Sequence, residues 1–191
     1  MLDRLRGRLD GYLGSVGRAF SRVSGSPSVW TGIGLALSVL SGVLYAYGGY
    51  RGQLGGGAMI LAAGWFDIVD GAVARVTNRA SRRGAFLDST LDRVAEVAVF
   101  LGILAGHLAP PMLVLAALSL SLLVSYARAK GDALGVPLSG VGIGERSERL
   151  LVLSVSSLLG YCGWGVLIVA LIAGYTFVER VYRALSGLSK S

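Results

Sequence analysis

The chain has few residues that could cross-link it or bind a soft metal, with one cysteine and one histidine among 191 residues. Cys162 is alone, so it cannot form an internal disulfide, and its apolar neighbours favour a role in packing. Charged residues make up only 15%, against about 25% in soluble domains, while apolar residues reach 53%. This composition excludes a disordered chain and disfavours a water-soluble globule.

Glycine and positive charge are both in excess. The 29 glycines show no three-residue period, which excludes collagen, and in an apolar chain glycine allows helices to approach closely. The formal net charge is +7. A basic surface suits nucleic acid, anionic lipid or phosphate-bearing substrates, so the placement of the cations has to decide among these partners.

Long apolar segments predict an all-α, polytopic membrane protein. A bilayer span needs about 20 residues, and four such windows precede a fifth that is too long for one span. We read the fifth window as two helices joined by a tight turn near Cys162–Gly165, because glycines interrupt it there. The six predicted spans therefore come from the windows Trp30–Gly48, Leu54–Ala74, Ala85–Gly106, Pro110–Ala127 and Leu150–Val178.

The cations gather in the loops on one side of these spans. The opposite loops hold only Arg51, so the positive-inside rule places both termini and the basic loops in the cytoplasm. A five-span count would leave Arg180, Arg183 and Lys190 outside and is rejected for that reason. This distribution favours membrane and phosphate partners, and we expect no nucleic-acid partner.

Residues 1–26 are predicted to form a juxtamembrane segment that precedes a membrane domain over residues 27–191. Apolar side chains recur at three- and four-residue steps from Leu2 to Val23, and arginines occupy the other face. A helix of this kind lies on an anionic membrane surface with its apolar side down. Arg18 and Arg22 would interrupt the apolar core of a signal peptide, so we expect an interfacial amphipathic helix.

Carboxylates occur where a bilayer disfavours them. Five of the 11 acidic residues lie between Asp67 and Glu96, within or beside two apolar spans. A charge at the bilayer centre costs about 2.5–3.5 kcal/mol, so such residues are read first as a functional site facing a cavity. Asp67 and Asp70 are three residues apart and share a helix face. Asp88 and Asp92, four apart, do the same on the next, antiparallel helix, so four carboxylates converge below the cytoplasmic surface.

Four converging anions repel one another unless a cation joins them. All-carboxylate ligand sets favour hard cations, so Mg²⁺ or Mn²⁺ is expected and zinc is disfavoured. Internal pairing with Arg75 and Arg93 would leave acids without a counter-charge. A cation or proton transporter built on the same acids is the alternative from a different class, although transporter acids usually lie nearer the bilayer centre.

The acids belong to a longer pattern: Asp67-x-x-Asp70-Gly71-x-x-Ala74-Arg75, eight further residues, then Gly84-x-x-x-Asp88-x-x-x-Asp92. This pattern resembles the signature of the CDP-alcohol phosphotransferase family at all eight fixed positions. The resemblance implies an enzyme that transfers a substituted phosphate from a CDP-linked lipid to an alcohol and releases CMP. It also implies Mg²⁺ or Mn²⁺ as the cofactor.

The resemblance assigns roles to single residues. It implies that Asp67, Asp70 and Asp88 are metal ligands, and that Asp92 is a metal ligand or the catalytic base. The family often has Pro-Asn-x-x-Thr at the first span; here Thr31 matches and Ser28 replaces the asparagine. The implied nucleotide-binding residues are Thr31, Asp67, Asp70, Gly71, Ala74, Arg75 and Gly84.

A second basic cluster follows the fourth predicted span. Positive-inside anchoring accounts for such cations, but their place at the mouth of a metal-loaded site also suggests a second phosphate. The stretches 125–130 and 145–150 resemble the inositol-phosphate branch of the family, whose acceptor is inositol 1-phosphate. Glycerol 3-phosphate is the alternative acceptor. The implied acceptor-phosphate residues are Arg128, Lys130, Arg146, Arg149 and Arg180.

We therefore expect an enzyme of phospholipid biosynthesis that is integral to the cell membrane, with its active site facing the cytoplasm. Its expected partners are the bilayer, a phosphorylated polyol and a CDP-linked lipid, either CDP-diacylglycerol or CDP-archaeol. A small-residue face with Gly32, Gly34 and Ala36 permits a homodimer, which is the usual state in the family.

Overall fold

Helices account for all the regular structure in the described part of the chain. The computed structural model describes the backbone of residues 2–189 and the side chains of residues 12–189. Within these residues no strand occurs, which confirms the predicted all-α class. The helices are α1 (Leu2–Ser21), α2 (Pro27–Ala46), α3 (Gly49–Val76), α4 (Arg82–Ala105), α5 (Pro111–Ala133), α6 (Arg146–Leu158) and α7 (Cys162–Leu188).

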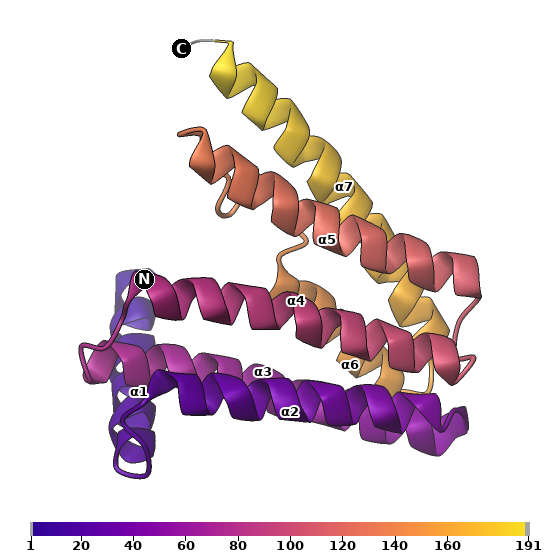
Figure 1. Ribbon diagram of the computed structural model, residues 1–191, viewed down its shortest axis with the longest axis horizontal. Helices are drawn as coiled ribbons and strands as arrows, with labels where there is room; N and C mark the ends of the chain where they lie inside the picture. Colours follow the sequence, from indigo (N-terminus) through magenta and orange to yellow (C-terminus); the bar gives the residue numbers. More distant parts are fainter. Residues whose placement is uncertain (1, 190–191) are drawn as a thin grey trace.

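Two groups of helices make up the bundle. Helices α2, α3 and α4 pack side by side, while α5 and α7 form a second pair (Figure 1). The short helix α6 contacts both α3 and α7 and so joins the groups. Towards the end of the bundle where α4 begins, α5 and α7 splay away from α4 (Figure 1). The helices therefore stay in contact at one end and open at the other.

Close packing of α2 on α4 depends on two glycines. A Cβ added to Gly42 would overlap the carbonyl oxygen of Ala98, and a Cβ on Gly102 would overlap the carbonyl oxygen of Gly42. Two backbones can approach to this distance only where side chains are missing. Phe100 and Ile103 lie on α4 on either side of Gly102, and both are buried in the same apolar core as Tyr45.

In the described part of the chain, four helices (α2, α3, α5 and α7) are long and apolar enough to cross a membrane. Helix α4 is long enough but carries charged residues through its first half. Helix α6 has 13 residues, which at 1.5 Å per residue is about 20 Å, shorter than the roughly 30 Å of bilayer hydrocarbon. Four spans are thus supported, and the count of six stays a prediction.

The predicted turn in the last apolar window lies earlier than Cys162–Gly165. Helix α6 ends at Leu158 and α7 begins at Cys162, so the turn occupies residues 159–161. Gly160 has φ +82°, a left-handed conformation that favours glycine and ends α6. Gly165 has another role, because a Cβ there would lie 2.7 Å from the Ser156 side chain. Gly165 therefore allows α7 to pack on α6 and does not belong to the turn.

The last two helices also extend beyond the predicted window. Helix α6 begins at Arg146 rather than Leu150, and α7 continues to Leu188 rather than Val178. The polar residues at the start of α6 are helical because Glu145 and Glu148 form a capping box there. Hydropathy marks the apolar stretch of a helix and misses such polar turns.

Helix α1 crosses the ends of α2, α3 and α4 near the start of α4 (Figure 1). It packs on α3, where a Cβ on Gly17 would lie 2.6 Å from the Ala72 carbonyl oxygen. Phe20 meets Trp30 edge-on, with 5.0 Å between ring centroids, and Trp30 stacks on Phe66 at 6.0 Å. The predicted helix is present; its apolar residues Leu2, Leu5 and Leu9 lie outside the described side chains, and its place on a membrane surface stays a prediction.

Candidate active site

Three aspartates meet between the last turns of α3 and the early turns of α4. Because the two helices are antiparallel, one carboxylate oxygen each from Asp67, Asp70 and Asp88 lies within 4.8 Å of the others. One oxygen of Asp88, Oδ1, is buried without a hydrogen-bond partner. This all-oxygen donor set with an unpartnered buried atom fits a hard divalent cation. We call these three residues the aspartate triad.

Asp92, the fourth predicted ligand, lies one turn further along α4 and is held by arginines. Its Oδ1 is 2.8 Å from Nη1 of Arg146, and its Oδ2 is 3.4 Å from Nη1 of Arg93. The same Arg146 nitrogen is 3.3 Å from Oδ2 of Asp67. Arg146 and Arg93 supply two positive charges to four aspartates, so the acids keep an excess of negative charge. Of the two arginines weighed as internal partners from the sequence, Arg93 pairs with Asp92, whereas no ion pair of Arg75 occurs among the described residues.

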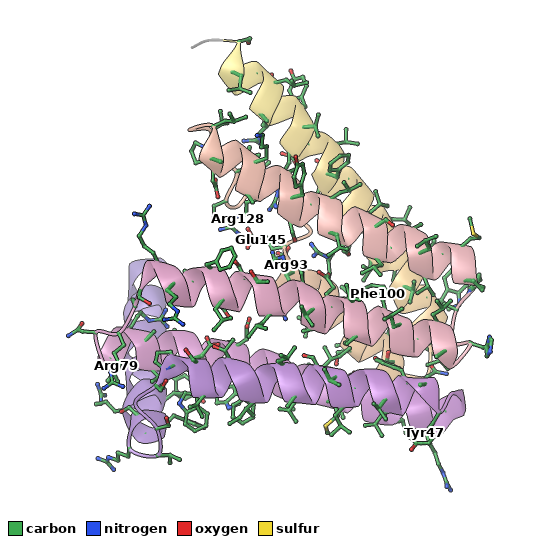
Figure 2. The ribbon with its side chains drawn as sticks, in the orientation of Figure 1. Tyr47, Arg79, Arg93, Phe100, Arg128 and Glu145 are labelled. Atoms are coloured by element: carbon green, nitrogen blue, oxygen red, sulfur yellow. The ribbon has the colours of Figure 1, made fainter. Side chains whose placement is uncertain are left out.

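A cavity of about 750 Å³ opens beside the acids, where α5 and α7 splay away from α4. Figure 2 shows Arg93, Arg128 and Glu145 gathered in this space between α4 and α5, with Arg79 at the nearer end of the bundle and Tyr47 at the far end. Among the residues predicted to bind the acceptor, Lys130 is exposed and does not line the cavity. The predicted residues that line it are Asp67, Asp88, Asp92, Arg128, Arg146, Arg149 and Arg180.

Arg149 is buried at the cavity wall against Glu96. Both residues are 1% exposed, and Nη2 of Arg149 donates to Oε1 of Glu96 at 2.9 Å. The guanidinium also donates to the carbonyl oxygen of Gly144 at 2.5 Å through Nη1. Glu96 was not among the site residues predicted from the sequence. Its position four residues after Asp92, on the same helix face, was the signal that could have identified it.

Arg180 and Arg128 tie the loop before α6 to the neighbouring helices. Arg180 donates through Nε to the carbonyl of Val141 at 3.1 Å and through Nη1 to the carbonyl of Val124 at 2.9 Å. Nη1 of Arg128 and Nη2 of Arg180 each lie 3.7 Å from the same oxygen of Glu145. These contacts fix the loop as the outer wall of the cavity.

Three cavity arginines each leave one buried N–H group without a hydrogen-bond partner. The atoms are Nε of Arg146, Nε of Arg149 and Nη2 of Arg180. An unsatisfied buried donor costs about 1–3 kcal/mol, and more when the group is charged, so such atoms are usually paired. Nη2 of Arg180 lies 3.7 Å from Glu145, whereas the Nε groups of Arg146 and Arg149 have no acceptor among the described residues. Three guanidinium groups that line one cavity favour an anion with several oxygen acceptors.

The predicted nucleotide residues lie around the triad, and Thr31 contacts it directly. The Thr31 hydroxyl donates to Oδ2 of Asp70 at 2.8 Å, so this side chain, predicted to bind the nucleotide, contacts a triad residue. A Cβ on Gly71 would meet only the Arg75 side chain, at 3.8 Å, and one on Gly84 only the Ser81 hydroxyl, at 3.1 Å. Close helix packing therefore does not explain either glycine.

Ala74 is half-buried and Arg75 is exposed on the last turn of α3. With Gly71 they occupy the part of α3 that follows the second triad aspartate. The structure thus brings the triad, Thr31 and four arginines together. It leaves Lys130 outside the cavity.

Comparisons with known proteins agree with this site. The sequence profile of CDP-alcohol phosphatidyltransferases matches residues 25–178. The chain is 32% identical over 184 residues to the archaetidylinositol phosphate synthase of Pyrococcus horikoshii, covering 96% of each chain. The chain therefore belongs to the CDP-alcohol phosphatidyltransferase family and is an enzyme of that class.

Solved structures give the same result. The phosphatidylinositol phosphate synthase of Mycobacterium tuberculosis in complex with manganese and citrate matches with a TM-score of 0.79 at 28% identity, covering 91% of this chain and 88% of that one. The same enzyme with CDP-DAG bound matches with a TM-score of 0.77, covering 90% and 92%. With four apolar helices of membrane-spanning length, these likenesses indicate an integral membrane protein.

Proposed function

We propose that this protein transfers a phosphatidyl-type group from a CDP-linked lipid to inositol 1-phosphate, releasing CMP. The observation that carries the proposal is the pairing of two unlike sites in one cavity. Asp67 and Asp88, two members of an aspartate triad that fits a divalent cation, line one part of the cavity, and Arg146, Arg149 and Arg180 line another. A reaction that transfers a lipid-bearing phosphate from a nucleotide diphosphate to a phosphorylated alcohol has to bind both a diphosphate and a second phosphate.

Asp67, Asp70 and Asp88 would hold Mg²⁺ or Mn²⁺. A bound divalent cation neutralises charge on the diphosphate and orients the leaving group. Thr31 holds Asp70 through its hydroxyl, and Gly71 and Gly84 leave room beside the triad for the nucleotide. Support for the metal also comes from the mycobacterial relative, whose structure was solved with manganese.

Asp92 is the proposed base. Its carboxylate lines the cavity with 17% of its side chain exposed and is oriented by Arg93 and Arg146. In the proposed step the acceptor hydroxyl oxygen bonds to the lipid-side phosphorus of the CDP-lipid while its proton passes to Asp92. The bond from that phosphorus to the bridging oxygen breaks, and CMP leaves with that oxygen.

The acceptor phosphate would be bound by Arg146, Arg149 and Arg180, with Arg128 at the rim of the cavity. Guanidinium groups suit this task because they stay charged and can bind phosphate oxygens in pairs. The volume of about 750 Å³ admits a sugar-sized polyol phosphate. Inositol 1-phosphate is preferred to glycerol 3-phosphate because the similar archaeal and mycobacterial proteins are inositol phosphate synthases by name.

The proposed membrane arrangement has six spans, α2 to α7. Helix α4 turns Asp88 and Asp92 towards the cavity. The short helix α6 is the fifth span, and it packs on α3 and α7. Both termini and the cavity face the cytoplasm, since the arginine-rich loops lie at that end. Helix α1, within residues 1–26, lies on the membrane surface, and residues 27–191 form the catalytic domain of a homodimer.

The test is product identification. Purified protein is incubated with CDP-archaeol or CDP-diacylglycerol and with inositol 1-phosphate, glycerol 3-phosphate, inositol or serine; CMP is measured and the lipid product identified by mass spectrometry. We expect product from inositol 1-phosphate, and only when Mg²⁺ or Mn²⁺ is added. Product from glycerol 3-phosphate alone would overturn the acceptor assignment. Ion flux in sealed vesicles without CMP release would favour a transporter.

A further inference from the structure

Arg146 is the one described residue whose side chain ion-pairs with a triad aspartate. It is the first residue of α6, and its side chain is 16% exposed. Nη1 contacts Asp92 at 2.8 Å and Asp67 at 3.3 Å, while Nε is buried without a partner. The same guanidinium therefore belongs both to the acidic cluster and to the set of arginines with unpartnered donors.

A divalent cation at the triad and the guanidinium of Arg146 compete for Asp67. Each positive charge would be attracted to the same carboxylate, and the two would repel each other across a few ångströms. A cation at the triad therefore weakens the contact of Arg146 with Asp67. By thermodynamic reciprocity, that contact also weakens the binding of the cation.

The Arg146 side chain can move while its backbone stays in place. The capping box of Glu145 and Glu148 fixes the first turn of α6, and the Arg149 side chain one turn later is buried. A long guanidinium side chain can then exchange partners by rotation about its own bonds. Its second partner is the anion that the free Nε groups of Arg146 and Arg149 indicate.

We propose that Arg146 couples the two halves of the site: cation binding at the triad releases its guanidinium from Asp67, and the released guanidinium binds the acceptor phosphate. This inference rests on the proposed function. It predicts that the acceptor binds more tightly once the cation is present, and that the cation binds more tightly once the acceptor is present.

The experiment measures Mn²⁺ binding without turnover. The free Mn²⁺ signal in electron paramagnetic resonance is titrated with full-length protein in detergent, with and without inositol 1-phosphate and in the absence of CDP-lipid. The variants are Arg146→Gln, which removes the charge, and Arg146→Lys, which keeps it. Arg183→Gln is the matched control, because Arg183 lies outside the cavity lining and pairs with Glu179 with 59% of its side chain exposed.

In the wild type, saturating inositol 1-phosphate should tighten Mn²⁺ binding by about fivefold or more, the range of ordinary coupling between sites. Without the acceptor, Arg146→Gln should bind Mn²⁺ more tightly than the wild type, and the effect of the acceptor should fall below about twofold. Arg146→Lys should bind Mn²⁺ alone like the wild type. Arg183→Gln should also bind Mn²⁺ like the wild type, and it should keep the full effect of the acceptor on Mn²⁺ binding.

Two results would overturn the inference. One is weaker Mn²⁺ binding in Arg146→Gln, which would mean that the arginine only organises the acids; the other is undiminished coupling in that variant. If either occurs while the wild type still converts inositol 1-phosphate to lipid product, the proposed function stands and the coupling role falls. Absence of product from any acceptor would instead remove the proposed function.

Discussion

Loss of the Glu96 charge should destabilise the bundle far more than loss of a comparable charge at the surface. Glu96→Gln leaves the Arg149 guanidinium buried without its anionic partner, since both residues are 1% exposed and lie 2.9 Å apart. Glu179→Gln is the matched control, because Glu179 pairs with Arg183 at 3.0 Å while the arginine side chain is 59% exposed.

The two losses differ because of burial. Removing one partner of a buried ion pair costs about 3–5 kcal/mol, whereas a surface pair contributes about 0–1 kcal/mol. For a chain of this length, 1 kcal/mol corresponds to about 2–4 °C in Tm. Glu96→Gln should therefore lower Tm by roughly 6–20 °C, and Glu179→Gln by less than about 4 °C.

Both Tm shifts are measured by heating the proteins in detergent at one fixed rate and using size-exclusion chromatography to measure how much folded protein remains at each temperature. The double substitution Glu96→Leu with Arg149→Met removes both charges and should recover most of the lost Tm, since an apolar pair replaces a buried ion pair at little cost. The double variant should nevertheless form no lipid product from inositol 1-phosphate, because Arg149 is one of the proposed acceptor-phosphate residues. Equal Tm values for Glu96→Gln and Glu179→Gln would refute the reasoning.

Three further substitutions test the site and the packing. Asp88→Asn should weaken Mn²⁺ binding at least about tenfold in an electron paramagnetic resonance titration. Asp132→Asn, which changes a cavity carboxylate outside the triad, should leave Mn²⁺ binding unchanged. Equal losses of Mn²⁺ affinity in the two variants would contradict the triad. Thr31→Val should weaken Mn²⁺ binding severalfold and Thr31→Ser should restore it, because the hydroxyl holds a triad carboxylate; indistinguishable variants would remove this role. Gly102→Ala should lower the free energy of unfolding by about 1–3 kcal/mol, since its Cβ would overlap a backbone oxygen. Gly64→Ala, with open space around it, should not lower it. A Gly102→Ala variant as stable as the wild type would contradict the close helix contact.

The sequence predicted the acidic half of the site well because its geometry is local. Asp67 and Asp70 share a helix face by spacing alone, and a short loop returns the chain with Asp88 at the same depth. The arginines of the cavity were singled out by the resemblance to the inositol-phosphate branch, since their place at the ends of apolar windows is equally explained by positive-inside anchoring. Lys130 was included with them by the same criterion, and the structure turns it outward.

The arginine half of the site was predicted only as a group of residues. Arg146 pairs with Asp67 from 79 positions away, and Arg149 pairs with Glu96 from 53 positions away. No periodicity connects residues at such separations, and a carboxylate in an apolar helix gives no sign of which cation will meet it. The same limit led the glycines near residue 163 to be read as a turn, since contact with a second helix cannot be seen in a single segment.

The sequence by itself determined that this chain forms apolar helices and that four carboxylates lie on two neighbouring ones, because helical spacing and hydropathy act over a few residues. Only the tertiary structure decided which arginine faces which acid, where α6 gives way to α7, and that α5 and α7 splay from α4 to leave a cavity. Those features depend on how separate helices pack, and packing is set by contacts among distant residues.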